Sequence, residues 1–269
     1  MPSPTPSCDA GNGDGAQAVG EWCLRLPDFL GLGTQKGGTT TLHQLLRRHP
    51  GIFLPPSKEL HYFTVHYAEG VSWYASHYAE APLHCRCGDI TPYYLFHPQA
   101  PGRIRDLLPN VKLIVLLRDP VERTLSQYFH AVRLGVEPLP LEQALVAEPR
   151  RLAGAEQSLA EAGVRHLSHQ EHSYLARSRY EQQLARYERL FAPEQLLVLR
   201  SEDLFSQPDR IWRRLLVFLE LEPVALPDAP PANAGAGEAA SVSPQLRGWL
   251  REQLDPTYLA MEKIYGIGW

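Results

Sequence analysis

The sequence predicts an α/β fold: a P-loop-like single domain with a central, mostly parallel β-sheet that is flanked by helices. First, residues 29–42 run from a short apolar stretch through a Gly-rich turn into an amphipathic helix. Second, residues 111–117 form a continuous apolar run, which is typical of a strand buried on both faces of a parallel sheet. Third, strand and helix patterns alternate along the chain, and strands that are connected through helices form right-handed parallel sheets.

The chain is long enough for one large domain, because its 269 residues are 44% hydrophobic. Residues 1–20 are rich in Pro, Ser, Gly, Asn and Asp, so we expect a disordered tail there and a domain over residues 21–269. Residues 149–171 carry charges and histidines without a clear period, which indicates a flexible helix or loop. Expected strands lie near residues 28–33, 85–90, 111–117 and 195–200. Expected helices lie near residues 39–48, 98–108, 120–134, 172–191, 207–220, 244–254 and 256–264.

The Gly-rich turn, within the segment FLGLGTQKGGTTTL, has the composition of a phosphate-binding loop. Its backbone N–H groups would point at an anion, the three threonine hydroxyls would add hydrogen bonds, and the next helix would contribute its positive end. A plain strand–turn–helix corner is the alternative, but such a corner does not need Gly, Lys and three Thr in succession. The candidate anion ligands are Lys36, Gly37, Gly38, Thr39, Thr40 and Thr41.

The position of the lysine decides which phosphate chemistry the loop supports. A Walker A loop ends in Gly-Lys-Ser/Thr, and the hydroxyl beside the lysine holds magnesium. Here Lys36 precedes the glycine pair, and nothing in the loop matches the magnesium ligand. The order of the residues therefore argues against Walker A chemistry.

A second helix start follows the apolar run at 111–117. Asp119 can cap this helix, Pro120 suits its first turn, and Glu122 stands three residues after the cap. One apolar stripe then follows, made of Val121, Leu125, Tyr128 and Val132. The pattern predicts a helix that begins directly beyond the strand and packs through this stripe.

Arg118 and Ser126 flank this helix start. Arg118 ends the strand, and Ser126 lies off the apolar stripe about two turns along the helix. Both side chains can converge on one anion at the carboxyl end of the sheet, where ligands of open α/β folds bind. The alternative is that Arg118 pairs with a surface carboxylate and that Ser126 is solvated.

Together these segments resemble those of a known enzyme family. Residues 35–40 (QKGGTT) are similar to the loop that holds the 5′-phosphosulfate in sulfotransferases using 3′-phosphoadenosine 5′-phosphosulfate (PAPS), and residues 118–128 resemble their 3′-phosphate site. The closer resemblance is to the heparan-sulfate type, including the 3-O- and N-sulfotransferase domains and their bacterial relatives. Further matching segments, in the expected order, are 58–63 (KELHYF), 70–74 (GVSWY), 91–92 (TP) and 198–204 (VLRSEDL). The resemblance covers about residues 28 to 269.

The resemblance implies transfer of a sulfuryl group from PAPS to a hydroxyl, less readily an amine, of a small molecule or carbohydrate. The product 3′-phosphoadenosine 5′-phosphate (PAP) would be released, and no metal is required. Lys36 would stabilise the leaving phosphate, Glu59 would be the general base, and His61 would orient the acceptor or share the proton transfer. An ion pair between Glu59 and Lys58 is the alternative, which we disfavour because adjacent residues of an extended segment point to opposite faces. Asp89 is a weaker candidate for the base, and a structural or acceptor-binding role suits it better.

Two other function classes remain as alternatives. A P-loop nucleotide kinase or NTPase shares the fold, but it would need Gly-Lys-Ser/Thr and a magnesium-holding Asp after a strand. A non-catalytic nucleotide-binding module would keep the Lys36 loop and the Arg118 site but would not need the Glu59 carboxylate.

Composition narrows the partners and the location. The net charge of −4 comes without a basic tail or block, so we expect no nucleic-acid partner. We find no apolar run of 18 residues and no signal core, so we expect a cytoplasmic protein without a membrane partner. The cysteines Cys8, Cys23, Cys85 and Cys87 form neither a disulfide framework nor a zinc spacing, so reduced thiols are expected. The sequence leaves the oligomeric state and the identity of the acceptor open.

The chain departs from the family pattern at several positions. Animal glycan enzymes place a lysine just before the Thr-Pro pair, where this chain has Ile90, so a contact to an anionic sugar chain is missing. In relatives a late loop often brings a Lys or Arg over the cofactor, but residues 230–243 of this chain contain no basic residue. Either this loop contributes backbone donors and Asn233 alone, or cofactor closure is weaker here. Tyr180 is expected either beside the cofactor or as a helical core tyrosine.

Overall fold

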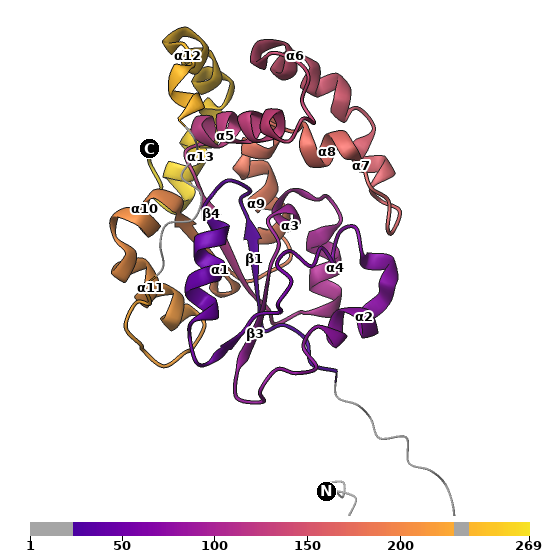
Figure 1. Cartoon of the computed structure of the whole chain (residues 1–269), viewed down its shortest axis with the longest axis vertical. Coiled ribbons are helices and arrows are strands. Elements are labelled where there is room, and N and C mark those ends of the chain that lie inside the picture. Colours follow the sequence, from indigo (N-terminus) through magenta and orange to yellow (C-terminus); the bar gives the residue numbers. More distant parts are fainter. Residues whose placement is uncertain (1–23, 229–236) are drawn as a thin grey trace, which may run out of the picture.

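Five parallel strands form one sheet at the centre of the molecule (Figure 1). The computed structural model describes residues 24–228 and 237–269. The strand order is β2-β3-β1-β4-β5. The strands are β1 (Phe29–Gly33), β2 (Ile52–Phe53), β3 (Arg86–Ile90), β4 (Lys112–Leu117) and β5 (Leu196–Arg200). Outside the described ranges lie the expected tail at 1–20, Cys8, Cys23, and residues 230–236 of the late loop with Asn233.

The predicted fold class is confirmed, and each of the four predicted strands lies within one residue of its expected bounds. The sequence did not indicate β2, because a strand of two residues is too short to show a period. The central position of β1 matters for the site. Because β1 pairs with β4 in parallel, the segments that follow these two strands leave the sheet at the same edge.

Helices and short 3₁₀ turns connect the strands and cover the sheet. The α-helices are α1 (Thr39–Arg47), α2 (Gly70–Ser76), α3 (Tyr93–Phe96), α4 (Ala100–Leu107), α5 (Pro120–Arg133), α6 (Leu141–Leu152), α7 (Ala155–Ser158), α8 (Leu167–Glu171), α9 (Tyr180–Glu188), α10 (Ser201–Ser206), α11 (Pro208–Phe218), α12 (Pro244–Gln253) and α13 (Asp255–Tyr265). The 3₁₀ turns are η1 (Tyr67–Glu69), η2 (Ala176–Ser178), η3 (Pro193–Gln195) and η4 (Glu238–Ser241).

The alternation of side chains along β4 divides the core into two layers. Leu113, Val115 and Leu117 point to one face, where they pack with residues of α2, α4 and α9. Ile114 and Leu116 point to the other face, where they pack with α1 and α11. Figure 1 shows α1 and α11 on one side of the strands and α2 and α4 on the other. A third apolar cluster joins α5, α6 and α12, which lie towards the top of the same view.

The helix start after β4 follows the prediction. Pro120 is the first residue of α5, and the Asp119 carboxylate accepts a hydrogen bond from the Glu122 N–H at 2.8 Å. The predicted apolar stripe is wrong at one residue, Val132, whose side chain is 41% exposed. It lies in the last turn of α5, where Ala131 is buried in its place.

The predicted single helix over 172–191 is also wrong. The chain forms η2 and then α9, with a non-helical residue, Arg179, between them. Long-range contacts cause the break, because the Ser178 hydroxyl donates to Pro120 O at 3.0 Å and the buried Arg123 guanidinium donates to Ser178 Oγ. The region at 149–171, expected to lack regular structure or to form one flexible helix, contains the end of α6, all of α7 and all of α8.

Candidate active site

The loop between β1 and α1 is held by its own backbone. The Thr34 N–H donates to Leu116 O at 2.7 Å, which fastens the loop to β4. The Gly37 N–H donates to Thr34 O at 3.0 Å, so it does not point at an anion as expected. The reason for glycine at this position is space, because a Cβ on Gly37 would lie 2.8 Å from Leu116 O. Gly38 has a φ of 86° and caps α1, a conformation that favours glycine.

The first turn of α1 forms the end of the loop that can bind an anion. The first N–H groups of a helix have no acceptor within that helix, and the helix dipole makes this end positive. Thr39 and Thr41 are buried, whereas Thr40 is half-buried. The Thr40 hydroxyl accepts a hydrogen bond from the Lys58 ammonium at 3.0 Å. Behind the loop, the Ser201 hydroxyl donates to Gly37 O at 2.8 Å, so the start of α10 supports the turn.

Positive charge gathers around Lys36. Burial lowers the pKa of the Lys36 ammonium, and neighbouring positive charges lower it further. These charges belong to Arg133, Arg118, Arg123 and Lys58. Several cations thus surround one partly buried ammonium group, so the loop suits an anionic ligand.

Arg118 lies directly against the loop, because its Nη1 donates to Lys36 O at 3.4 Å. In the part of the chain that the structure describes, Arg118 forms no ion pair with a carboxylate, unlike in the surface alternative. The hydroxyl of Tyr180 donates to the Arg118 carbonyl at 2.9 Å, and Tyr180 is fully buried. Tyr180 is therefore a core residue that fixes the end of β4, and the interpretation of it as a cofactor-side residue is wrong.

Ser126 lies half-buried on α5, on a face that carries two further basic side chains. His130 and Arg133 stand four and seven residues further along, so they share this face. Burial lowers the pKa of His130, and the positive charges of Lys36 and Arg133 add to the effect. The face therefore continues the cationic surroundings of the loop. The spacing of 126, 130 and 133 was the signal that would have revealed it.

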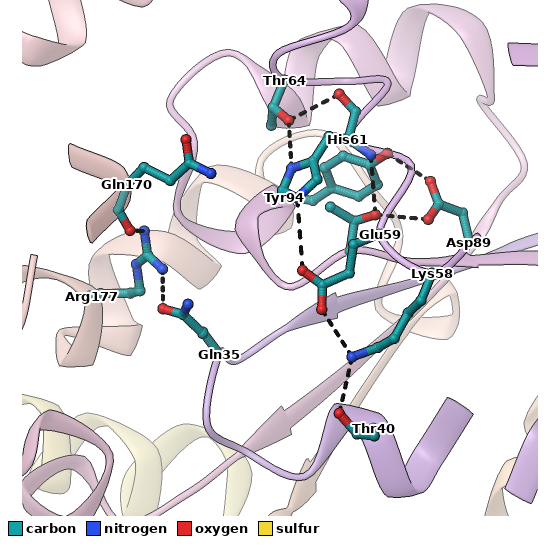
Figure 2. Close-up of polar contacts among 11 residues, drawn as sticks. Gln35, Thr40, Lys58, Glu59, His61, Thr64, Asp89, Tyr94, Gln170 and Arg177 are labelled. Atoms are coloured by element: carbon teal, nitrogen blue, oxygen red, sulfur yellow. Dashed lines mark hydrogen bonds and ion pairs between the residues drawn. The ribbon is translucent and has the colours of Figure 1, made fainter. Parts of the chain in front are cut away.

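Glu59 lies beside the loop, as expected, but not in the expected way (Figure 2). Its Oε1 pairs with the Lys58 ammonium at 2.9 Å, and its Oε2 lies 3.7 Å from Nε2 of His61. The argument that Lys58 and Glu59 point to opposite faces is wrong, because Glu59 has a φ of 61° and the segment is not extended. His61 has a φ of 55°, so the chain turns twice here and directs three polar side chains to one place.

The contacts of Glu59 set its protonation state. Burial raises the pKa of this carboxyl, but the His61 ring and the Lys58 ammonium outweigh burial and bring the pKa down to about 2. The side chain remains 37% exposed, so it can meet a second molecule. Glu59 is thus an ionised, accessible carboxylate next to the first turn of α1.

Asp89 has a different environment and is structural. It is 2% exposed and accepts hydrogen bonds from the hydroxyls of Tyr94 at 2.6 Å, Thr91 at 2.8 Å and Tyr74 at 3.0 Å. The Thr91 hydroxyl in turn lies 3.5 Å from the His61 N–H, so Asp89 supports the turn that carries His61. Ile90 is buried in the core against Gly31, so its side chain does not face the site.

A buried arginine that no sequence pattern indicated contacts the loop through Gln35. Arg177 is 2% exposed; its Nη1 donates to Gln35 Oε1, and its Nη2 donates to the carbonyls of His169 at 3.0 Å and Gln170 at 2.8 Å (Figure 2). The guanidinium also lies 5.2 Å from the ring centroid of Tyr93. Arg177 therefore joins α8 to the residue that precedes Lys36. No local pattern signals a contact between residues so far apart in the sequence.

Other expectations concern metals, membranes and thiols. Among the described residues, no group of three or more His, Cys, Asp or Glu side chains is placed to hold a metal ion. None of the helices within residues 24–228 and 237–269 is both long and apolar enough to cross a membrane. Cys85 and Cys87 are buried free thiols, as expected for these two.

Comparisons with known proteins identify the family. A family model described as a sulfotransferase domain matches residues 26–226. The chain is 29% identical to the membrane-associated sulfotransferase kil1 of Dictyostelium discoideum, over 78% of this chain and 59% of that protein. It is 28% identical to human heparan sulfate glucosamine 3-O-sulfotransferase 3B1, over 82% of this chain and 51% of that protein. The chain thus spans little more than half the length of these two curated relatives.

A solved structure agrees with these relatives. The crystal structure of a sulfotransferase from Alicyclobacillus acidocaldarius superposes with a TM-score of 0.75 at 26% identity, over 91% of this chain and 98% of that one. The predicted family is confirmed, and the family model favours it over the kinase and NTPase alternatives. The chain therefore belongs to the sulfotransferase family.

Proposed function

We propose that this enzyme transfers a sulfuryl group from PAPS to a hydroxyl, less readily an amine, of a small-molecule or carbohydrate acceptor, and releases PAP. One observation carries the proposal. The Glu59 carboxylate and the first turn of α1 belong to a single set of contacts through Lys58 and Thr40 (Figure 2). A loop that can bind an anion and an accessible base are thereby held next to each other.

The reaction assigns a task to each group. The acceptor oxygen forms a bond to sulfur while the bond between sulfur and the bridging phosphate oxygen breaks. The electron pair of the broken bond stays on that phosphate oxygen, where Lys36 would stabilise the growing negative charge. The proton of the acceptor hydroxyl passes to Glu59, which the structure holds ionised. His61, beside Glu59, would orient the carboxylate or the acceptor.

The surroundings of the loop support PAPS as the donor. Lys36, Gly38 and the N–H groups that begin α1 would hold the 5′-phosphosulfate, with hydroxyls from Thr39, Thr40 and Thr41 nearby. Arg118 and Ser126 would hold the 3′-phosphate. PAP should therefore stabilise the enzyme without metal, by about 2.7 kcal/mol at a hundredfold excess over its Kd, and ATP with magnesium should do much less. Preferential stabilisation by ATP in a thermal unfolding assay would contradict this donor.

Mass-shift screening of candidate acceptors with the purified enzyme and PAPS tests the function itself. An accepted compound gains the mass of one SO₃ unit. Replacing Glu59 with Gln keeps the shape and removes the base, so we expect kcat to fall by about 10²–10⁴-fold while PAP affinity stays within about threefold. Glu69→Gln, at an exposed position in η1, is the matched control and should turn over normally. Near-normal turnover in Glu59→Gln would exclude Glu59 as the base, and His61 would be tested next.

A further inference from the structure

Lys58 contacts the candidate site, but the proposed function gives roles to Lys36 and Glu59 and none to Lys58. Its ammonium donates to Thr40 Oγ1 at 3.0 Å and to Glu59 Oε1 at 2.9 Å (Figure 2). Thr40 is the second residue of α1, so Lys58 lies between the Glu59 carboxylate and the helix end that attracts anions. Lys58 thus touches both halves of the site at once.

The charges and the exposure of Lys58 indicate that its ammonium can meet an anionic ligand. Lys58 is one of the cations that lower the pKa of Lys36, so the two ammonium groups act on the same space. Lys36 comes from the loop itself, whereas Lys58 reaches the loop from the segment after β2. The Lys58 side chain is 26% exposed, so its ammonium is open to a ligand. An ammonium has three N–H donors, and the two contacts above use two of them.

The contact with Lys58 is also an obstacle to the reaction. The charged groups that act on Glu59 are Lys58 and His61 on its own segment and Arg177 from η2, while His43 on α1 feels the Glu59 charge. A carboxylate that is held by a neighbouring ammonium has a low pKa and takes up a proton poorly. Glu59 would become a better base if Lys58 moved to another anion. A donor bound at the first turn of α1 would bring such an anion within its reach.

We propose that Lys58 contacts the sulfonate of the bound donor and, in doing so, releases the Glu59 carboxylate to take the acceptor proton. This inference rests on the proposed function. The contact of the Lys58 ammonium changes from a carboxylate to a sulfonate, and no covalent bond forms or breaks at Lys58. Glu59 thereby becomes an effective base only when the donor is bound, because it remains paired with Lys58 until the sulfonate binds.

The first test uses the difference between donor and product. PAPS carries the sulfonate and PAP lacks it, so Lys58→Met should weaken PAPS binding by about tenfold to a hundredfold and PAP binding by less than about threefold. Lys58→Arg, which keeps the positive charge, should restore part of the PAPS affinity. Lys263→Met, at an exposed position on α13, is the matched control and should bind both nucleotides normally. Calorimetry without acceptor measures the PAPS and PAP affinities of the wild type and of the three variants.

The second test asks whether Glu59 and the donor compete for Lys58. Glu59→Gln should free the ammonium and tighten PAPS binding several-fold, with little effect on PAP. In the Lys58→Met background the same substitution should change PAPS binding much less, because no ammonium is left to release. If Lys58→Met is recovered unfolded, Lys58→Gln, which keeps a hydrogen-bond donor for Thr40, replaces it in both tests.

The outcomes separate this inference from the proposed function. Equal losses of PAPS and PAP affinity in Lys58→Met, or equal effects of Glu59→Gln in both backgrounds, would overturn the role of Lys58. A wild-type enzyme that binds neither nucleotide and transfers no sulfuryl group would instead overturn the proposed function.

Discussion

Replacing Arg118 with Ala gives the clearest test of the proposed 3′-phosphate site. In the structure the guanidinium donates a hydrogen bond to Lys36 O at 3.4 Å, and in the described part of the chain it pairs with no carboxylate. Removing it therefore strands no buried charge, so we expect little loss of stability. A hydrogen bond between a charged donor and a phosphate contributes about 1.5–3 kcal/mol, which corresponds to a Kd for PAP that is roughly 10 to 150 times higher.

The assay for Arg118→Ala compares two nucleotides by calorimetry. PAP carries the 3′-phosphate and adenosine 5′-phosphosulfate lacks it, so only PAP should lose affinity. Arg214→Ala, at an exposed position on α11, is the matched control and should bind both nucleotides as the wild type does. Equal losses for both nucleotides would show that Arg118 acts elsewhere, for example on the loop backbone at Lys36.

Two further predictions concern the groups that support the site. Gln35→Ala removes the side-chain partner of the buried Arg177, which should lower Tm by about 3–12 °C; Gln35→Glu should restore Tm, and an unchanged Tm for Gln35→Ala in scanning fluorimetry would contradict the contact. Burial lowers the pKa of His97 to about 3 and that of His169 to about 2, so between pH 6.5 and 3 the unfolded chain binds protons that the folded chain does not. The free energy of unfolding should therefore decrease as the pH is lowered, by at most about 1.4 kcal/mol per pH unit for each histidine. Urea unfolding at pH 7, 6 and 5 measures this slope, which His97→Gln should flatten; an identical slope in that variant would refute the assignment.

The parts of the site that could be predicted come from short, continuous segments. The loop and the first turn of α1 lie within residues 29–42, and strand β4, Arg118 and the cap of α5 lie within residues 111–122. In both segments the backbone path follows from local rules: apolar runs, glycines and a helix cap. The sheet then brings the two segments together, because the strands that precede them are neighbours.

The parts that could not be predicted depend on backbone angles or distant contacts. The positive φ of Glu59 places its carboxylate beside Lys58, and no residue pattern indicates that a glutamate adopts this conformation. The break between η2 and α9 depends on contacts of Ser178 with Pro120 and Arg123, more than fifty residues away in sequence. Local periodicity does not depend on such distant contacts, so it predicted one uninterrupted helix.

The anchoring of Arg177 limits how this enzyme can be redesigned. The buried carboxylate of Glu148 on α6 accepts hydrogen bonds from the N–H groups of Leu175 at 2.8 Å and Ala176 at 2.7 Å, directly before Arg177. Arg177 then reaches across to Gln35. A chimera that exchanges the stretch from α6 to η2 for that of a relative would therefore also exchange the support of the loop. Such a graft has to carry a compatible partner for Gln35, or its effect on sulfuryl transfer will be mistaken for a change in specificity.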